Sequence, residues 1–133
     1  MSKYITFLTY CVATMLITTT TDAQKTDIDA LNAPAFKEKM EKTLDHILLD
    51  VRTPGEVKDG VIPGAKVMDF NSSDFARQLD TLDKGETYFV YCKGGGRSSR
   101  TVELMKQTGF NHIHELKGGF TDWVKQGYPV VKP

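Results

Sequence analysis

One short segment combines a thiol, three glycines and two cations, and it is the strongest chemical signal in the chain. Cys92 is followed in order by Lys93, Gly94, Gly95, Gly96, Arg97 and Ser98. Glycine reaches positive φ without a steric penalty, so this backbone can curl until several N–H groups converge and bind negative charge. Lys93 and Arg97 add positive potential. Together these features predict a lowered pKa for Cys92 and a nucleophilic thiolate.

The segments on both sides of this loop should place the sulfur at the end of a buried strand. Residues 87–91 are aromatic and β-branched, which predicts a short strand that ends just before Cys92. After the loop, apolar residues recur with helical spacing until Gly109, which predicts a helix that begins at Ser98 or Ser99. The N-terminus of this helix would face the thiol and favour its negative charge. Ser98 would cap the helix or donate a hydrogen bond to the loop.

Two other interpretations of Cys92 stay open at this point. A cysteine can be an inert, buried part of the core, but such a residue needs neither a glycine-rich loop nor two flanking cations. A phosphatase or arsenate-handling enzyme would also use a cysteine followed by an arginine. Phosphatases that use such a loop place five residues between the cysteine and the arginine, whereas four residues separate Cys92 from Arg97. The shorter loop disfavours the phosphatase interpretation.

Three motifs of this chain resemble those of the rhodanese (thiosulfate sulfurtransferase) domain family. The first is the six-residue loop from Cys92 to Arg97. The second joins residues 48–56 to residues 60–65, and the third joins residues 116–120 to Trp123 and residues 127–130. The resemblance covers about residues 28–131. One departure is Val61, where the family usually has histidine.

The resemblance implies a sulfurtransferase that moves sulfane sulfur from thiosulfate or a similar donor through a persulfide on Cys92. Lys93, Arg97, Ser98 and the three glycines would bind the substrate and the persulfide. The alternative is a sulfur-carrier module that accepts persulfide sulfur from a partner protein without turning over free thiosulfate. A second group of candidates is Asp50, Arg52 and Glu56, for which a structural role is favoured. Arg52 is the one of these three best suited to contact the substrate.

The rest of the chain predicts one α/β domain with a mostly parallel five-stranded sheet and helices on both faces. The predicted strands are residues 28–31, 46–51, 65–70, 87–91 and 112–116. The predicted helices are residues 34–42, a segment after 71–73 that carries Phe75 and Leu79, residues 98–108 and residues 120–126. Phe120, Trp123 and Val124 are expected to pack over the sheet. In such folds a ligand lies at the carboxyl ends of the strands.

The N-terminus predicts export. Lys3 is followed by an apolar stretch, residues 4–17, and by small residues before Gln24, so we expect a signal peptide of residues 1–23 and a mature domain of residues 24–133. The apolar stretch is too short to span a membrane. Cleavage would remove Cys11 and leave Cys92 as the one cysteine of a periplasmic or secreted protein, in which an internal disulfide is impossible.

Charge and composition exclude some classes of binding partner. The 133 residues carry 17 basic and 17 acidic side chains, without a basic stripe, so neither nucleic acid nor a membrane is expected as a partner. Small anions remain as the expected ligands, and the resemblance to rhodanese domains implies a small anionic sulfur donor, a thiol or cyanide acceptor and a protein acceptor of sulfur. His46, His112 and His114 show no metal-ligand spacing, so we expect no metal site and no cofactor.

Overall fold

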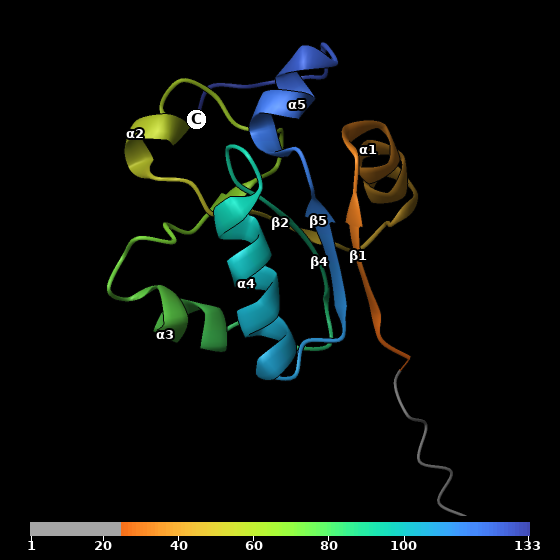
Figure 1. Ribbon diagram of the computed structural model, residues 1–133, viewed down its shortest axis with the longest axis vertical. Helices are drawn as coiled ribbons and strands as arrows, with labels where there is room; N and C mark the ends of the chain where they lie inside the picture. Colours follow the sequence, from red (N-terminus) through yellow and green to blue (C-terminus); the bar gives the residue numbers. More distant parts are fainter. Residues whose placement is uncertain (1–24) are drawn as a thin grey trace, which may run out of the picture.

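The computed structural model describes residues 25–133. The predicted signal peptide, with Cys11, lies outside these described residues. Strands and helices alternate from the start of the described part (Figure 1). In chain order they are β1 (Asp27–Leu31), α1 (Ala33–Lys42), β2 (Ile47–Asp50), α2 (Pro54–Val57), β3 (Lys66–Val67), α3 (Phe75–Asp80), β4 (Thr87–Tyr91), α4 (Gly96–Gln107), β5 (His112–Leu116) and α5 (Gly119–Lys125). Across residues 25–133, no helix has the length and apolar character that crossing a membrane requires.

The strands form one five-stranded parallel sheet in the order β1-β5-β4-β2-β3. The apolar strands β2 and β4 pair in the middle of the sheet, where Leu49 lies opposite Val90. Parallel strands that are buried on both faces are apolar almost throughout, which is why these two segments were readily predicted. All five carboxyl ends meet at one edge, and β4 delivers Cys92 to that edge.

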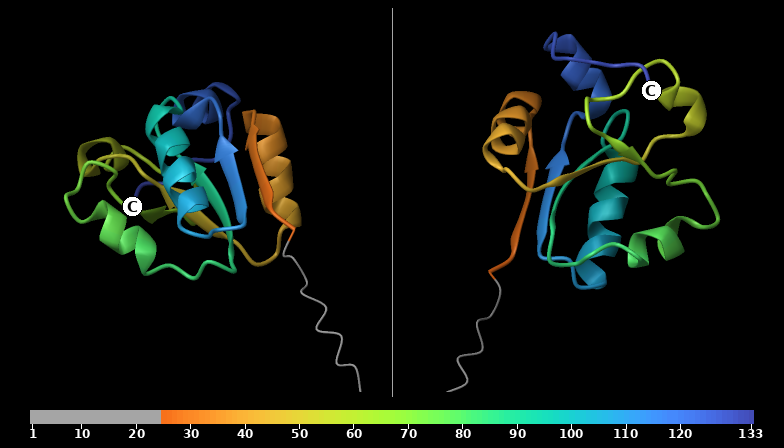
Figure 2. Two further views of the ribbon diagram at one scale, coloured as in Figure 1. Left: turned by 60° about the horizontal axis from the view of Figure 1, so that its bottom comes forward. Right: turned by 180° about the vertical axis from the view of Figure 1, so that it is seen from behind.

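Helices cover both faces of the sheet, as Figure 2 shows. Helices α3 and α4 pack on one face, where Phe75, Leu79, Val102 and Met105 meet side chains of β2, β4 and β5. Helices α1 and α5 pack on the other face, where Phe36 and Trp123 contact Leu48, Phe89 and Leu116. The predicted fold class is therefore confirmed. These two cores hold the sheet rigid beneath the loops that carry the candidate site.

Three predicted details of the elements are wrong. The strand predicted over residues 65–70 is only Lys66–Val67, because it forms the edge of the sheet, where Val67 remains 40 % exposed and few contacts hold it. Helix α3 follows Asp74 rather than a cap in residues 71–73, and no side-chain cap bond forms there. Val124 is half exposed, so Trp123, and not Val124, is the apolar anchor of α5.

Candidate active site

The loop from Cys92 to Gly95 links the end of β4 to the start of α4. Helix α4 begins at Gly96, two residues earlier than the earlier of the two predicted starts, because Gly95 has a φ of 111° and turns the chain directly into the helix. Positive φ is needed at this one glycine of the three, since neither Gly94 nor Gly96 adopts it. The prediction that all three glycines curl the loop is therefore wrong in detail.

The start of α5 supports this loop through the backbone. The N–H of Phe120 donates to the carbonyl of Cys92 at 2.8 Å, and the N–H of Thr121 donates to the carbonyl of Lys93 at 3.0 Å. A Cβ on Gly95 would overlap the carbonyl oxygen of Lys117, and a Cβ on Gly119 would overlap the backbone of Lys93. Two loops that are distant in sequence thus touch backbone to backbone, at positions where only glycine fits.

The Cys92 sulfur is buried and is surrounded by hydrogen-bond donors. The N–H of Gly95 donates to Sγ at 3.1 Å, and the Ser98 hydroxyl lies 3.4 Å from Sγ. Burial opposes ionisation of the thiol, but the hydroxyl of Ser98 and the backbone N–H groups of Ser98, Gly95 and Gly94 outweigh it and lower the pKa of Cys92. The direction is the one that the sequence predicted, and it favours the thiolate.

Ser98 does not cap the helix. The N-cap position belongs to Gly95, and Ser98 lies in the first turn of α4, fully buried. Its hydroxyl is within hydrogen-bond distance of the Gly95 carbonyl oxygen (3.1 Å) and of Oε1 of Glu115 (2.9 Å). Of its two predicted roles, the hydrogen bond to the loop is the one observed.

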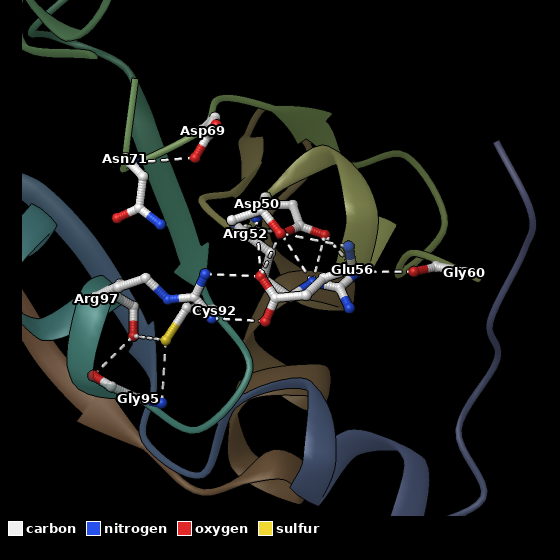
Figure 3. A network of polar contacts seen from close by, with 11 residues as sticks. Asp50, Arg52, Glu56, Gly60, Asp69, Asn71, Cys92, Gly95 and Arg97 are labelled. Atoms are coloured by element: carbon white, nitrogen blue, oxygen red, sulfur yellow. Dashed lines mark hydrogen bonds and ion pairs between the residues drawn. The ribbon is translucent and has the colours of Figure 1, made fainter. Parts of the chain in front are cut away.

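The two cations of the loop differ in their environment. Arg97 forms a two-bond ion pair with Glu56 of α2, at 2.7 and 2.8 Å, and Figure 3 shows both carboxylate oxygens turned toward the guanidinium. The hydrogen bond from Arg97 is the main reason that the pKa of Glu56 falls to about 2. Lys93 is exposed, and its ammonium has no ion-pair partner among residues 25–133. Substrate contact by either cation stays a prediction.

Glu56 also organises the turn that carries it. Its carboxylate accepts hydrogen bonds from the N–H and the hydroxyl of Thr53, both at 2.9 Å, and the Thr53 hydroxyl accepts from the Glu56 N–H in return. This capping box starts the four-residue helix α2. Glu56 therefore connects α2 to the loop of Cys92 through Arg97.

Asp50 and Arg52 form a buried ion pair beside this site. The guanidinium of Arg52 donates to both carboxylate oxygens of Asp50 and, at 2.7 Å, to the carbonyl of Gly60. It also lies 4.0 Å from the centre of the Phe120 ring. This is the geometry expected of the structural role that the sequence favoured for the pair. Substrate contact by Arg52 stays a prediction.

Besides the Arg97–Glu56 pair, the sequence did not predict two other groupings of side chains. Glu115 of β5 reaches the Ser98 hydroxyl, and the one hint in the sequence was an acidic residue next to the last residue of a predicted strand. Asp27, Asp29 and His114 come together because β1 and β5 pair in register, with Asp29 opposite His114. Spacing along the chain was therefore the wrong test for a metal site. The Lys39 ammonium bonds to both carboxylates, at 3.4 and 2.9 Å, and supplies positive charge there.

Comparison with known proteins finds similarity to rhodanese-like proteins in both sequence and structure. The model of the family "Rhodanese-like domain" matches residues 32–126. A sulfurtransferase of Allochromatium vinosum is 26% identical over 106 residues, which are 80% of this chain and 97% of the relative. A putative sulfur carrier protein of Bacillus subtilis, YrkF, is 27% identical over 96 residues, 72% of this chain and 51% of that relative. A crystal structure of a rhodanese-related protein from Thermoplasma volcanium superimposes with a TM-score of 0.67 at 32% identity, covering 77% of this chain and 96% of that one.

Proposed function

We propose that this chain, which belongs to the rhodanese-like domain family, moves sulfane sulfur from a thiosulfate-like donor to a thiophilic acceptor through a persulfide on Cys92. The observation that carries the proposal is the buried Cys92 sulfur, which accepts a hydrogen bond from Gly95 at 3.1 Å and lies beside the Ser98 hydroxyl. These donors stabilise negative charge on sulfur, and an ionised sulfur is what covalent sulfur transfer requires.

The reaction has two halves. In the first, the Cys92 thiolate attacks the outer sulfur of the donor, a new S–S bond forms at Cys92, and the S–S bond of thiosulfate breaks as sulfite leaves with the bonding electrons. In the second, a thiolate or cyanide attacks the outer sulfur of the persulfide, and Cys92 leaves as the thiolate. The loop N–H groups stabilise the charged sulfur in both halves without having to reorganise.

Electrostatics support an anionic donor. Lys93 offers a positive charge that no ion pair matches within the described residues, and the N-terminus of α4 adds its dipole. Arg97 contributes less, because Glu56 already matches its charge. We propose that Lys93 attracts the donor and that Arg97 contacts it after exchanging one hydrogen bond with Glu56.

The same Arg97–Glu56 pair favours a second candidate, a sulfur carrier that is loaded by a partner protein. A doubly charged donor meets the Glu56 carboxylate as well as the cations, so the pair weakens the attraction for free thiosulfate. A protein persulfide delivers one charged sulfur and gains additional contacts from its own surface. Both candidates use the persulfide on Cys92, and they differ in the donor.

Mass spectrometry of the intact protein distinguishes these candidates. An enzyme that uses free thiosulfate should gain the mass of one sulfur atom within its turnover time and lose it when cyanide is added. The Cys92→Ser variant should gain nothing. Equal transfer by wild type and Cys92→Ser would refute both candidates, whereas slow loading by thiosulfate and fast loading by a protein persulfide would favour the carrier. Cys92-dependent hydrolysis of an aryl phosphate would instead revive the phosphatase interpretation.

Export is proposed on the sequence alone. We propose cleavage after Ala23 and action in the periplasm or outside the cell, with no cofactor and with neither nucleic acid nor membrane as a partner of the mature protein. The N-terminal residue of the protein purified from its native compartment tests this proposal. A chain that retains residues 1–23 would refute it.

A further inference from the structure

The carboxylate of Glu115 lies behind the active loop, and the sulfur transfer described above gives it no task. Glu115 is the fourth residue of β5, its side chain is on the α4 face of the sheet, and the residue is 8 % exposed. Its Oε1 lies 2.9 Å from the Ser98 hydroxyl oxygen, which in turn lies 3.4 Å from the Cys92 sulfur. A buried carboxylate and a buried thiol are thus joined by one hydroxyl group.

The Ser98 hydroxyl has one proton and three polar neighbours. These are Oε1 of Glu115, the Gly95 carbonyl oxygen at 3.1 Å and the Cys92 sulfur. A hydroxyl donates one hydrogen bond and accepts two. While the pair holds one proton, an ionised Glu115 accepts from the hydroxyl, and Cys92 is then a thiol that donates to the hydroxyl oxygen. If Glu115 is protonated, it donates to the hydroxyl oxygen, which frees the Ser98 proton for the Cys92 thiolate.

We propose that Cys92 and Glu115 share one proton through the Ser98 hydroxyl, so that Glu115 is the internal acceptor of the Cys92 thiol proton. The thiol proton moves to the Ser98 oxygen as the Ser98 proton moves to Oε1 of Glu115. Thiol plus carboxylate become thiolate plus carboxylic acid, with no change in net charge and no further reactant. Glu115 acts through Ser98 and touches no substrate, so it is a positioning residue.

The surroundings of Glu115 suit this task. Its register partners on the neighbouring strands are Ala30 of β1 and Val90 of β4, which carry no charge. Helix α4 faces it with Ser98, and Cys92 is the titratable group that this contact joins to it. Burial raises the pKa of Glu115 against the opposing effect of the Ser98 hydrogen bond. A carboxyl group with a raised pKa is better able to hold the proton of a thiol whose pKa is lowered.

The role of Glu115 in sulfur transfer rests on the proposed function, but the shared proton can be measured without any sulfur donor. The rate at which iodoacetamide alkylates Cys92 reports the thiolate fraction at each pH. In wild type we expect two rises separated by about one pH unit or more, because a coupled pair loses its protons in two macroscopic steps. In Glu115→Gln we expect one rise, since the glutamine amide donates permanently to the Ser98 hydroxyl.

A second pair of variants tests whether Glu115 acts through the hydroxyl. In a Ser98→Ala background, adding Glu115→Gln should leave the alkylation profile unchanged, as a double-mutant cycle requires for a linear chain of contacts. A single rise in wild type, two rises in Glu115→Gln, or an undiminished effect of Glu115→Gln without Ser98 would each overturn the proposal. If Glu115→Gln does not fold, Glu115→Met, which has a similar length and cannot bind a proton, replaces it with the same expectation.

The two proposals fail separately. A wild-type protein that acquires no sulfur from any donor but shows the two-step alkylation profile would refute the sulfur transfer and leave the shared proton standing. A protein that transfers sulfur but shows a one-step alkylation profile would refute the shared proton and leave the sulfur transfer standing.

Discussion

Replacing Gly95 with alanine should damage the active loop far more than the same change one residue later. Gly95 has a φ of 111°, and a Cβ there would overlap the carbonyl oxygen of Lys117. That carbonyl cannot retreat freely, because the N–H of Lys117 donates to the Leu31 carbonyl at 2.8 Å. Gly96 provides the matched control, since a Cβ on it meets nothing within 4 Å and its φ is negative.

Gly95→Ala should change two quantities, the free energy of unfolding and the pKa of Cys92. A non-glycine residue in the left-handed region costs about 1–2 kcal/mol, and the overlap with Lys117 adds to this, so Gly95→Ala should lose at least about 2 kcal/mol of unfolding free energy. Movement of the loop also removes the hydrogen bond from the Gly95 N–H to the Cys92 sulfur. A hydrogen bond to a charged group contributes about 1.5–3 kcal/mol. Its loss should therefore raise the pKa of Cys92 and slow the alkylation of the thiol at neutral pH.

Urea unfolding measures the change in stability, and the pH dependence of Cys92 alkylation measures the change in ionisation of the thiol, in the same samples. Gly96→Ala should unfold at the same urea concentration as wild type, or slightly above it, because alanine favours a helix. Its Cys92 should titrate as in wild type. If Gly95→Ala and Gly96→Ala could not be distinguished in either measurement, neither the positive φ nor the N–H bond to sulfur would matter as argued.

Three further changes test the supports of the site. Glu56→Gln should cost about 1–2 kcal/mol of unfolding free energy at neutral pH, allowing for solvent screening. Because the pKa of Glu56 is lowered from 4.5 to about 2, this contribution is complete above the higher value and is lost as the pH falls to the lower one, so the two proteins should converge in acid. Arg52→Met should cost about 3–5 kcal/mol, since it leaves the Asp50 charge buried and unpaired, and Asp50→Leu in the same chain should restore part of the loss. Trp123→Ala should cost about 3–5 kcal/mol in thermal or urea unfolding, whereas Val124→Ala, at a half-exposed position, should change little.

The sequence predicted those parts of the fold and site that depend on local patterns. Strands β2 and β4 were predicted because buried parallel strands are apolar throughout, and the loop was predicted because Cys92 and its donors are contiguous. The length of the edge strand β3 was overestimated, since the residues of a segment do not reveal how far a neighbouring strand will pair with it. The start of α4 was misplaced because one glycine dihedral, invisible in the sequence, sets it.

The contacts that the sequence did not predict all join elements that are distant along the chain. Arg97 and Glu56 are 41 residues apart, and Asp29 and His114 are 85 apart. A charged residue reveals its sign but not its partner, so the sequence did not predict the ion pair of Arg97 with Glu56. Only the strand order brings such partners together, and that order follows from packing of the whole sheet.

The loop contains two kinds of interaction, hydrogen bonds to the Cys92 sulfur and contacts of its charged side chains. The Gly95 N–H and the Ser98 hydroxyl stabilise a negative charge on Cys92, and salt does not screen these contacts appreciably inside the protein. The Arg97–Glu56 pair holds the loop to α2 and leaves little net charge there. Under the proposed function, attraction of an anionic donor would depend chiefly on the exposed Lys93, whose field is screened by salt. The reactivity of the sulfur and the proposed attraction of the donor should therefore respond differently to salt and to substitution of Lys93.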